Sequence, residues 1–253
     1  IMTVDYSAWV GATETAEDTI NDAPALAAAA TFDGAATVFA AGSPRPPLWH
    51  WFYFLPRAPQ SRLGADGHPQ RGGFMPPIEL PRRMFAGGRL RFLHPLVIGK
   101  PATRSATIRD VSQKDGKTGT LAFVTVGYVI SQDGRVCIEE EQDIVYREAQ
   151  RAGDVAAAPQ RAPADAAWQR EWHPDEVLLF RYSALTFNGH RIHYDRSYVT
   201  GVEGYPGLIV HGPLIATLLV DLLRRQLPGA RLRRFQFKAV RPIFDIHRFD
   251  VCG

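Results

Sequence analysis

The sequence predicts a protein of the α+β class, built from two segments that each combine a helix with antiparallel strands. A helix-like stretch is followed by four strand-like stretches before residue 148. A segment rich in alanine, proline and charge, without aromatic residues, then interrupts the pattern. Helix-like and strand-like stretches return after it. We therefore expect an N-terminal domain at residues 1–148, a linker at 149–167 and a C-terminal domain at 168–253.

The first segment opens with a helix over "DTINDAPALAAAATFDG", which Thr19 or Asp22 can cap and Gly34 can end. A long irregular stretch, rich in proline and glycine, follows at about residues 42–83. Loops of this length in compact proteins are usually functional or pack over other elements. Because this loop contains the aromatic block at 49–54, we expect that block to be buried, chiefly as packing.

The next part of the chain predicts an antiparallel meander. Four stretches alternate in polarity or are rich in β-branched residues: "GRLRFLHPLVIG", "ATRSATIRDVSQ", "GTLAFVTVGYVISQ" and "VCIEEEQDIVYRE". The turn signals "KDGKTG" and "QDGR" separate the last three of them, as expected for hairpins.

The C-terminal segment begins with a helix over "HPDEVLLFRYSALTF", where Asp175 and Glu176 favour its first turn. A second helix is predicted over "GPLIATLLVDLLRRQL", with Pro213 in its first turn. Its apolar face comprises Leu214, Thr217, Leu218, Val220 and Leu222. The stretch "ARLRRFQFKAVRPIFD" alternates as a strand. Few strands are predicted in this half, so either its sheet is small or the protein continues past Gly253.

Composition indicates an ordinary globular protein, with 45% hydrophobic and 22% charged residues. No apolar run approaches the length of about 20 residues that a membrane span needs. The first residues do not resemble a signal peptide. Cys137 and Cys252 lie far apart, so we expect reduced thiols and a cytoplasmic location.

The net charge of +3 and the isoelectric point of about 9.0 permit anionic partners. The most basic run comprises Arg224, Arg225, Arg231, Arg233, Arg234, Lys238 and Arg241. It is either a solvated face or a landing surface for a phosphorylated small molecule. Phe235 and Phe237 interleave with these charges, but their spacing of two fits one face of a strand better than base stacking. We therefore expect no nucleic-acid partner.

Chemistry concentrates in "TFNGHRIHYD", the ten residues between the two C-terminal helices. His190, His193 and Asp195 could bind a metal, but their spacing differs from H-E-x-x-H, so we expect no metal. No nucleophile elbow and no catalytic cysteine signature is present. Single histidines in polar turns are usually structural, and His190 can simply hold the loop. General acid–base chemistry by His193 is the remaining functional interpretation.

The later stretch "VHGPL" supplies a second catalytic component. A helix that begins near Gly212 presents free backbone N–H groups and the positive end of its dipole. These groups can stabilise an oxyanion that forms on a thioester, while a nearby histidine moves a proton at the adjacent carbons. The combination suits enolate chemistry on an acyl thioester.

The motif "ALTFNGHRIHYD", with "HGPL" after a further 15 residues, resembles the hydratase motif of the MaoC-type enoyl-CoA hydratases. Most of the chain resembles the double-hotdog hydratases and dehydratases, including mesaconyl-C4-CoA hydratase, itaconyl-CoA hydratase and mitochondrial hydroxyacyl-thioester dehydratase type 2. The stretches "PLWHWFYFLP", "GHPQRGGFMPP", "FAGGRLRF", "EEQDIVYRE" and "VEGYPGLIVHGPL" carry this likeness. It implies a tandem hotdog fold, in which each antiparallel sheet wraps a long helix.

The resemblance places the catalytic histidine of the family at His193 and its oxyanion-hole glycine at Gly212. Asn188 occupies the position of its catalytic aspartate, His190 that of an asparagine and Arg191 that of a proline. An amide can hold water but cannot exchange a proton at neutral pH. The second proton-transfer group would then be water, a substrate carboxylate, Asp195 or His190.

We thus expect His193, Asn188 and Gly212 to be catalytic, and His190, Arg191, Asp195 and His211 to contact substrate. Arg191 either binds a substrate carboxylate, as a C4 or C5 dicarboxyl thioester would require, or faces solvent. The expected activity is reversible hydration of an α,β-unsaturated acyl-CoA by a hydro-lyase without cofactor. The alternatives are dehydration of carrier-protein-bound hydroxyacyl chains and non-catalytic thioester binding. A hotdog thioesterase is also conceivable. The resemblance further implies a homo-oligomer.

Overall fold

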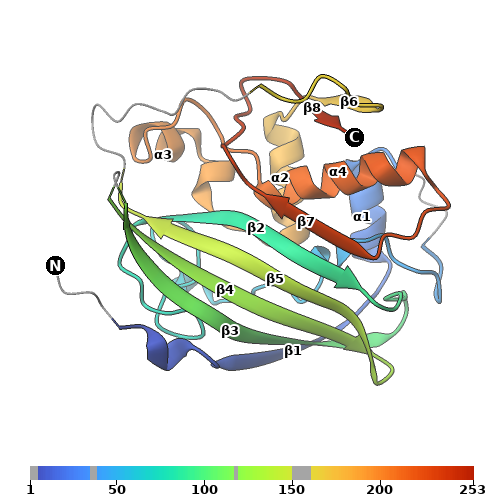
Figure 1. Cartoon of the computed structure of the whole chain (residues 1–253), viewed down its shortest axis with the longest axis horizontal. Helices are drawn as coiled ribbons and strands as arrows, with labels where there is room; N and C mark the ends of the chain where they lie inside the picture. The colour runs from blue at the N-terminus through green and yellow to red at the C-terminus, as the bar shows by residue number, and fades with distance from the viewer. Residues whose placement is uncertain (1–4, 35–38, 117–118, 150–160) are drawn as a thin grey trace.

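The computed structural model describes residues 5–34, 39–116, 119–149 and 161–253, and its dominant feature is one curved antiparallel sheet. Figure 1 shows this sheet below a layer formed by helices. The strands are β1 (Thr13–Thr19), β2 (Arg82–Phe92), β3 (Pro101–Gly116), β4 (Gly119–Gln132), β5 (Arg135–Arg147), β6 (Gln169–Trp172), β7 (Arg234–Lys238) and β8 (Phe249–Cys252). The helices are α1 (Ala23–Thr31), α2 (Glu176–Thr186), α3 (Arg196–Gly201) and α4 (Gly212–Gln226). Short 3₁₀ turns lie at Ser7–Trp9, Trp49–Phe52, Gln60–Arg62 and Arg191–His193.

Among the described residues, the main sheet has the strand order β1-β3-β4-β5-β2-β7. The predicted meander is confirmed as β2 to β5. In the hairpin between β4 and β5, Asp133 and Gly134 have φ values of 53° and 72°. Positive φ at both central residues matches the tight hairpin turn that an Asp-Gly pair favours. The other turn signal, "KDGKTG", falls partly outside the described residues.

The two halves of the chain share the main sheet. Strand β7, from the C-terminal half, pairs with β2 from the N-terminal half, in register from Gly87 opposite Lys238 to Arg91 opposite Arg234. Strands β6 and β8 form a separate two-stranded sheet. The small number of strands predicted for the second half is therefore observed, and one of those strands extends the first sheet.

The predicted helices are present, with the ends that their sequences favour. The side chain of Asp175 caps α2 by accepting a hydrogen bond from the Leu178 N–H at 2.8 Å. Helix α4 begins at Gly212, and Pro213 stands in its first turn. The whole apolar face predicted for α4 is buried: Leu214, Thr217, Leu218, Val220 and Leu222.

The aromatic block is buried, as expected. Trp49 and Phe52 pack in the core that includes helices α1, α2 and α4. The Phe52 ring meets the Tyr182 ring of α2 edge-on, with 5.9 Å between ring centroids. Trp51, Tyr53 and Phe54 also line a cavity. The block therefore connects the loop of the N-terminal half to the helices of the C-terminal half.

One strand was not predicted from the sequence, and most of the predicted linker lies outside the described residues. Strand β1, "TETAEDT", pairs with β3 at the sheet edge, and its polar composition gives no strand signal. Most of the predicted linker at 149–167 falls outside the described residues. In the part of the chain that the structure describes, no helix is long and apolar enough to cross a membrane.

Candidate active site

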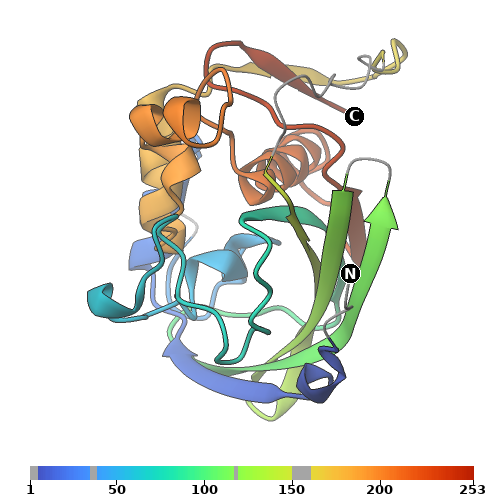
Figure 2. The ribbon, with the colours of Figure 1, turned by 90° about the vertical axis from the view of Figure 1, so that its left-hand side faces the viewer.

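A cavity of about 1610 Å³ lies between the main sheet and the helices. Its walls include β2 and β5 of the sheet, the loop at residues 53–75, helix α2, the loop at 186–194 and the first turn of α4. Figure 2 shows the cyan and teal loop between the curved sheet and the orange helices. Ligand cavities for small molecules usually measure about 300–1,000 Å³. This larger space has room for an extended ligand.

The end of α2 positions the motif "TFNGHRIHYD" at this cavity. Phe187 ends the helix in the left-handed conformation, with a φ of 49°, and the Asn188 N–H bonds the Ser183 carbonyl at 2.8 Å. The chain then turns through Arg191–His193. The Ile209 N–H fixes this turn by bonding the Ile192 carbonyl at 3.0 Å. Asn188, His190, Arg191 and His193 consequently all line the cavity.

His193 is buried and held in one orientation. Its Nδ1 lies 2.7 Å from the Ile209 carbonyl oxygen. Because a carbonyl only accepts hydrogen bonds, Nδ1 carries the proton and Nε2 keeps its lone pair. Burial lowers the pKa of His193 to about 4, although the bond to Ile209 raises it in part. His193 is therefore a neutral imidazole at physiological pH, able to accept a proton.

His211 and Gly212 bring the start of α4 to the same place. The rings of His193 and His211 stack with their centroids 3.6 Å apart, and His211 Nε2 lies 2.9 Å from the Ser183 hydroxyl. Burial, followed by His193 and His190, lowers the pKa of His211 well below its ordinary value. Within the described residues, the Gly212 N–H has no hydrogen-bond acceptor. A Cβ at Gly212 would lie 3.3 Å from Phe85 Cδ1, so a glycine allows the helix end to approach β2 closely.

Asn188 is half-buried, and the oxygen of its side-chain amide already has a hydrogen-bond donor. Its Oδ1 accepts a hydrogen bond from the His190 N–H at 3.0 Å. The same contact shapes the loop, as asparagine side chains commonly do in turns. No described residue accepts from the Asn188 NH₂ group, so this group is the part of the side chain that can hold a ligand in the cavity.

The structure places one expected substrate contact away from the cavity. Asp195 is not among the residues that line the cavity, and it caps α3 by accepting from the Tyr198 N–H at 2.9 Å. Arg191 lines the cavity, makes an ion pair with Asp195 at 2.7 Å, donates to the Ala65 carbonyl at 3.0 Å and stacks on the Tyr198 ring. These contacts hold its guanidinium against the protein, and a contact between Arg191 and substrate stays a prediction.

The loop of the N-terminal half contributes site residues that the motif alone did not indicate. His68 lines the cavity, with Asp66 bonded to it at 3.1 Å, and the His68 ring lies against the His190 ring with 4.1 Å between centroids. His190 in turn meets the His193 ring at 5.5 Å. The available signals were the Asp-Gly-His sequence at 66–68 and the length of the loop. Neither signal says which distant segment this loop contacts.

A second imidazole–carboxylate pair lies on the sheet side of the cavity. His50 Nε2 is 2.7 Å from Glu140 Oε2, and Trp51 and Gln142 donate to Glu140 Oε1 at 2.9 and 2.7 Å. Burial lowers the pKa of His50 in spite of this carboxylate. For Glu140, burial alone would raise the pKa, but His50 and the two donors lower it below its ordinary value.

The fold and the site together define a class, the double-hotdog proteins of the MaoC type. A MaoC-like dehydratase structure from Phytophthora capsici aligns with a TM-score of 0.70, covering 98% of this chain and 87% of that chain at 16% identity. A Mycobacterium tuberculosis protein described as having a double hotdog fold aligns with a TM-score of 0.57, covering 93% and 81% of the two chains at 14% identity. The predicted α+β tandem hotdog class is confirmed.

Sequence comparison then identifies the family. Residues 48–245 match the family model of hydroxyacyl-thioester dehydratase type 2, and the chain belongs to this family. It is similar to mesaconyl-C(4)-CoA hydratase of Chloroflexus aurantiacus, with 56% identity over 98% of this chain and 89% of that protein. It is also similar to the mitochondrial hydroxyacyl-thioester dehydratase type 2 of Schizosaccharomyces pombe, with 28% identity over 81% and 76%. The predicted resemblance is thus confirmed.

Proposed function

We propose that this chain is a hydro-lyase that reversibly adds water across the α,β-double bond of an acyl-CoA thioester. The observation that carries the proposal is the position of His193. Its Nδ1 bond to Ile209 leaves Nε2 free, and its ring stacks beside the start of α4 in a cavity large enough for a thioester. The names of the two sequence relatives, a hydratase and a dehydratase, denote the two directions of this reaction.

The site geometry supports a role for three groups in the reaction. His193 Nε2 takes the proton from the attacking water, whose oxygen forms the bond to Cβ. The Gly212 N–H, at the positive end of the α4 dipole, stabilises the negative charge that develops on the thioester oxygen. The Asn188 NH₂ group can hold the oxygen of the attacking water. His190 and His211 pack against the His193 ring and hold its orientation.

The direct test is a panel of crotonyl-, mesaconyl- and itaconyl-CoA and 3-hydroxyacyl-CoA esters, followed by mass spectrometry. We expect the intact thioester to gain or lose 18 Da, about one water, at catalytic rates of roughly 1–10³ s⁻¹ on the preferred acyl group. Release of free CoA would instead indicate a thioesterase. Binding of the esters without any mass change would indicate a non-catalytic thioester-binding protein. Turnover only on carrier-protein-bound chains would favour the carrier-protein dehydratase alternative.

The substrate class is proposed to be an acyl-CoA that carries a carboxylate. The name of the Chloroflexus relative describes such a substrate. In the described part of this chain, Arg83 is the half-buried arginine of the cavity for which no hydrogen bond or ion pair is found. Its charge lies close to the histidines: burial lowers the pKa of His68, and Arg83 lowers it further. A partially buried cation without a partner favours an anionic group of the substrate.

The CoA end is proposed to lie near exposed cations at the cavity margin. Arg57, Lys238 and Arg241 are exposed and line the cavity, so they can meet phosphate groups. Other members of the predicted basic run are engaged elsewhere. Arg224 and Arg225 pair with Asp221, and Arg231 donates to the Leu93 carbonyl. Within the basic run, only Lys238 and Arg241 thus support the interpretation that it binds phosphate groups.

Replacing Arg83 with glutamine tests the carboxylate assignment. A hydrogen bond to a charged group contributes about 1.5–3 kcal/mol, so kcat/KM for a carboxylated enoyl-CoA should fall by about 10–100-fold. Hydration of crotonyl-CoA, which lacks the carboxylate, should change by less than about threefold. The matched control is Arg91→Gln on the same strand, because Arg91 pairs with Glu139 away from the cavity. Equal losses on both substrates would refute the assignment.

The homo-oligomer and the cytoplasmic location stay predictions from the sequence and its resemblance to the family. Light scattering coupled to gel filtration measures the first of these, and a single-chain mass in solution would contradict it.

A further inference from the structure

The site described so far lacks the second proton-transfer group that acid–base catalysis of hydration uses. Asn188 stands where an aspartate is expected, and Asp195 is occupied as the cap of α3. The geometry points to Asp66 and His68 as the replacement: His68 is a catalytic proton donor and acceptor, and Asp66 positions it and balances its charge. This inference rests on the proposed hydration chemistry and adds two residues to it.

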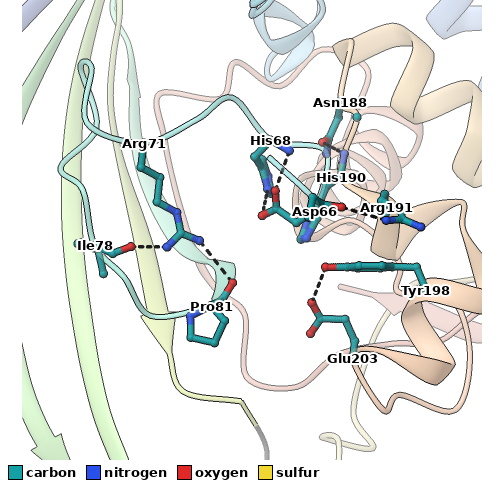
Figure 3. A network of polar contacts seen from close by, with 12 residues as sticks. Asp66, His68, Arg71, Ile78, Pro81, Asn188, His190, Arg191, Tyr198 and Glu203 are labelled. Atoms are coloured by element: carbon teal, nitrogen blue, oxygen red, sulfur yellow. Dashed lines mark hydrogen bonds and ion pairs between the residues drawn. The ribbon is translucent and has the colours of Figure 1, made fainter. Parts of the chain in front are cut away.

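The two side chains form a directly bonded pair, of which His68 lines the cavity. Asp66 Oδ2 lies 3.1 Å from His68 Nδ1, and Asp66 Oδ1 accepts from the His68 backbone N–H at 3.0 Å. Figure 3 shows this pair beside His190 and Asn188. An ionised carboxylate only accepts hydrogen bonds, so His68 Nδ1 carries a proton and Nε2 is the free nitrogen. The same arrangement orients the histidine of a catalytic triad and stabilises its imidazolium form.

The loop that carries this pair is fixed against the motif that carries His193. The Arg191 N–H donates to the Asp66 carbonyl at 2.9 Å, and the Arg191 guanidinium donates to the Ala65 carbonyl at 3.0 Å. Gly67 and Gly189 pass so closely that a Cβ on Gly67 would lie 1.8 Å from the Gly189 oxygen. Contacts of this kind hold catalytic groups in a fixed relative position.

Several charged or titratable groups face His68. Asp66 and Arg71 lie on its own loop, His190 on the motif loop, and Arg83 on β2. Burial lowers the pKa of His68, Asp66 opposes this change, and the two arginines add to it. For Asp66, burial would raise the pKa, but its bonds to His68 hold it below the ordinary value. The Asp66 carboxylate therefore stays ionised and favours the protonated form of His68.

The chemistry uses one proton shared between two imidazoles. In hydration, the water oxygen bonds to Cβ, the π electrons move onto the thioester oxygen, and His193 Nε2 takes the water proton. His68, in the protonated form that the Asp66 carboxylate favours, then delivers its Nε2 proton to Cα as the enolate electrons return to form the Cα–H bond, and His68 is left neutral with its proton on Nδ1. Solvent exchange through the cavity moves the proton from His193 back to His68. Dehydration runs through the same steps in reverse.

Two other arrangements compete with this assignment. Ligand atoms of Asp66, His68 and His190 lie within 4.8 Å of one another, a separation that a metal ion could bridge. In the structure Asp66 and His68 bond each other directly, so the pair is satisfied without an ion, and metal analysis is one arm of the test. The His50–Glu140 pair is the other candidate for the second group. Within the described residues the His50 ring contacts Trp51 and neither His190 nor His193, whereas His68 contacts His190 directly.

The test compares His68→Gln and Asp66→Asn with wild type in hydration of the preferred enoyl-CoA. We expect His68→Gln to lower kcat by about 10²–10⁴-fold with little change in KM. We expect Asp66→Asn to lower kcat less and to move the high-pH limb of the kcat/KM profile to lower pH, because the imidazolium loses its carboxylate. His94→Gln and Asp110→Asn, both exposed and away from the cavity, are the matched controls.

Unreactive butyryl-CoA binding and thermal unfolding, measured on each variant, separate a lost proton donor from a misfolded site. Near wild-type kcat in His68→Gln, or an unmoved high-pH limb in Asp66→Asn, overturns the inference while leaving the proposed function intact. If kcat falls in His50→Gln but not in His68→Gln, the second proton-transfer group belongs to the His50–Glu140 pair. Stoichiometric zinc or iron in the purified protein, with activity lost to chelation, overturns it in favour of a metal site. Failure of wild type on every thioester instead removes the proposed function itself.

Discussion

Replacing His193 with glutamine is expected to lower kcat/KM for hydration by about 10³-fold or more, because positioned acid–base groups contribute about 10²–10⁴-fold and no other free imidazole nitrogen holds the same place. The amide of glutamine can still donate to the Ile209 carbonyl, which His193 Nδ1 reaches at 2.7 Å. It cannot accept a proton at neutral pH. The fold should therefore survive with a loss of about 1 kcal/mol in the free energy of unfolding.

The matched control for this variant is His247→Gln, an exposed histidine outside the cavity, which should retain wild-type activity. Absorbance of the enoyl thioester measures turnover, and circular dichroism measures the folded structure. Together they separate loss of chemistry from loss of structure. Retention of more than about a tenth of wild-type kcat/KM in His193→Gln would exclude His193 as the base.

Substituting alanine for Gly67 is expected to have the second largest effect, on both activity and stability. Gly67 has a φ of 89°, and an alanine Cβ there would lie 1.8 Å from the Gly189 carbonyl oxygen. A left-handed alanine costs about 1–2 kcal/mol, and forcing the two loops apart adds about 1–3 kcal/mol. Because a misplacement of 1 Å can reduce a rate by about 10²-fold, kcat should fall by at least that factor.

Gly72→Ala separates the two causes. Gly72 has a φ of 94°, but the nearest atom to a Cβ there is Pro77 Cβ at 3.7 Å, which is an ordinary contact. It should incur the backbone cost without separating the loops, and should keep near wild-type kcat. Equal effects of the two substitutions on unfolding and on kcat would show that the contact between Gly67 and Gly189 does not organise the site.

The features that sequence predicted are those encoded within one contiguous stretch. The hairpin of Asp133 and Gly134, the capped start of α2 and the apolar face of α4 each follow from local patterns. The placement of His193 and Gly212 at one cavity follows from a motif whose two parts lie 15 residues apart and flank a single connection.

The features that sequence did not predict depend on contacts between distant segments. Asp66 and His68 meet His190 across more than a hundred residues of chain, through a loop without regular periodicity. Arg191 and Asp195 have the chemistry of a substrate site, but they pair with each other at 2.7 Å. Strand β1 was not predicted because both of its faces are polar, so its sequence lacks the alternation of apolar and polar residues that indicates a strand. Residue type indicates what a side chain can do, whereas partners decide which function it performs.

The proposed reaction adds water to an acyl thioester without breaking the thioester bond. The most direct measurement is incubation of the preferred enoyl-CoA in H₂¹⁸O, followed by fragment mass spectrometry of the CoA product. We expect one ¹⁸O on Cβ of an intact thioester with wild type, and no incorporation with His193→Gln. Label in a released carboxylic acid together with free CoA, or equal incorporation by His193→Gln, would contradict it.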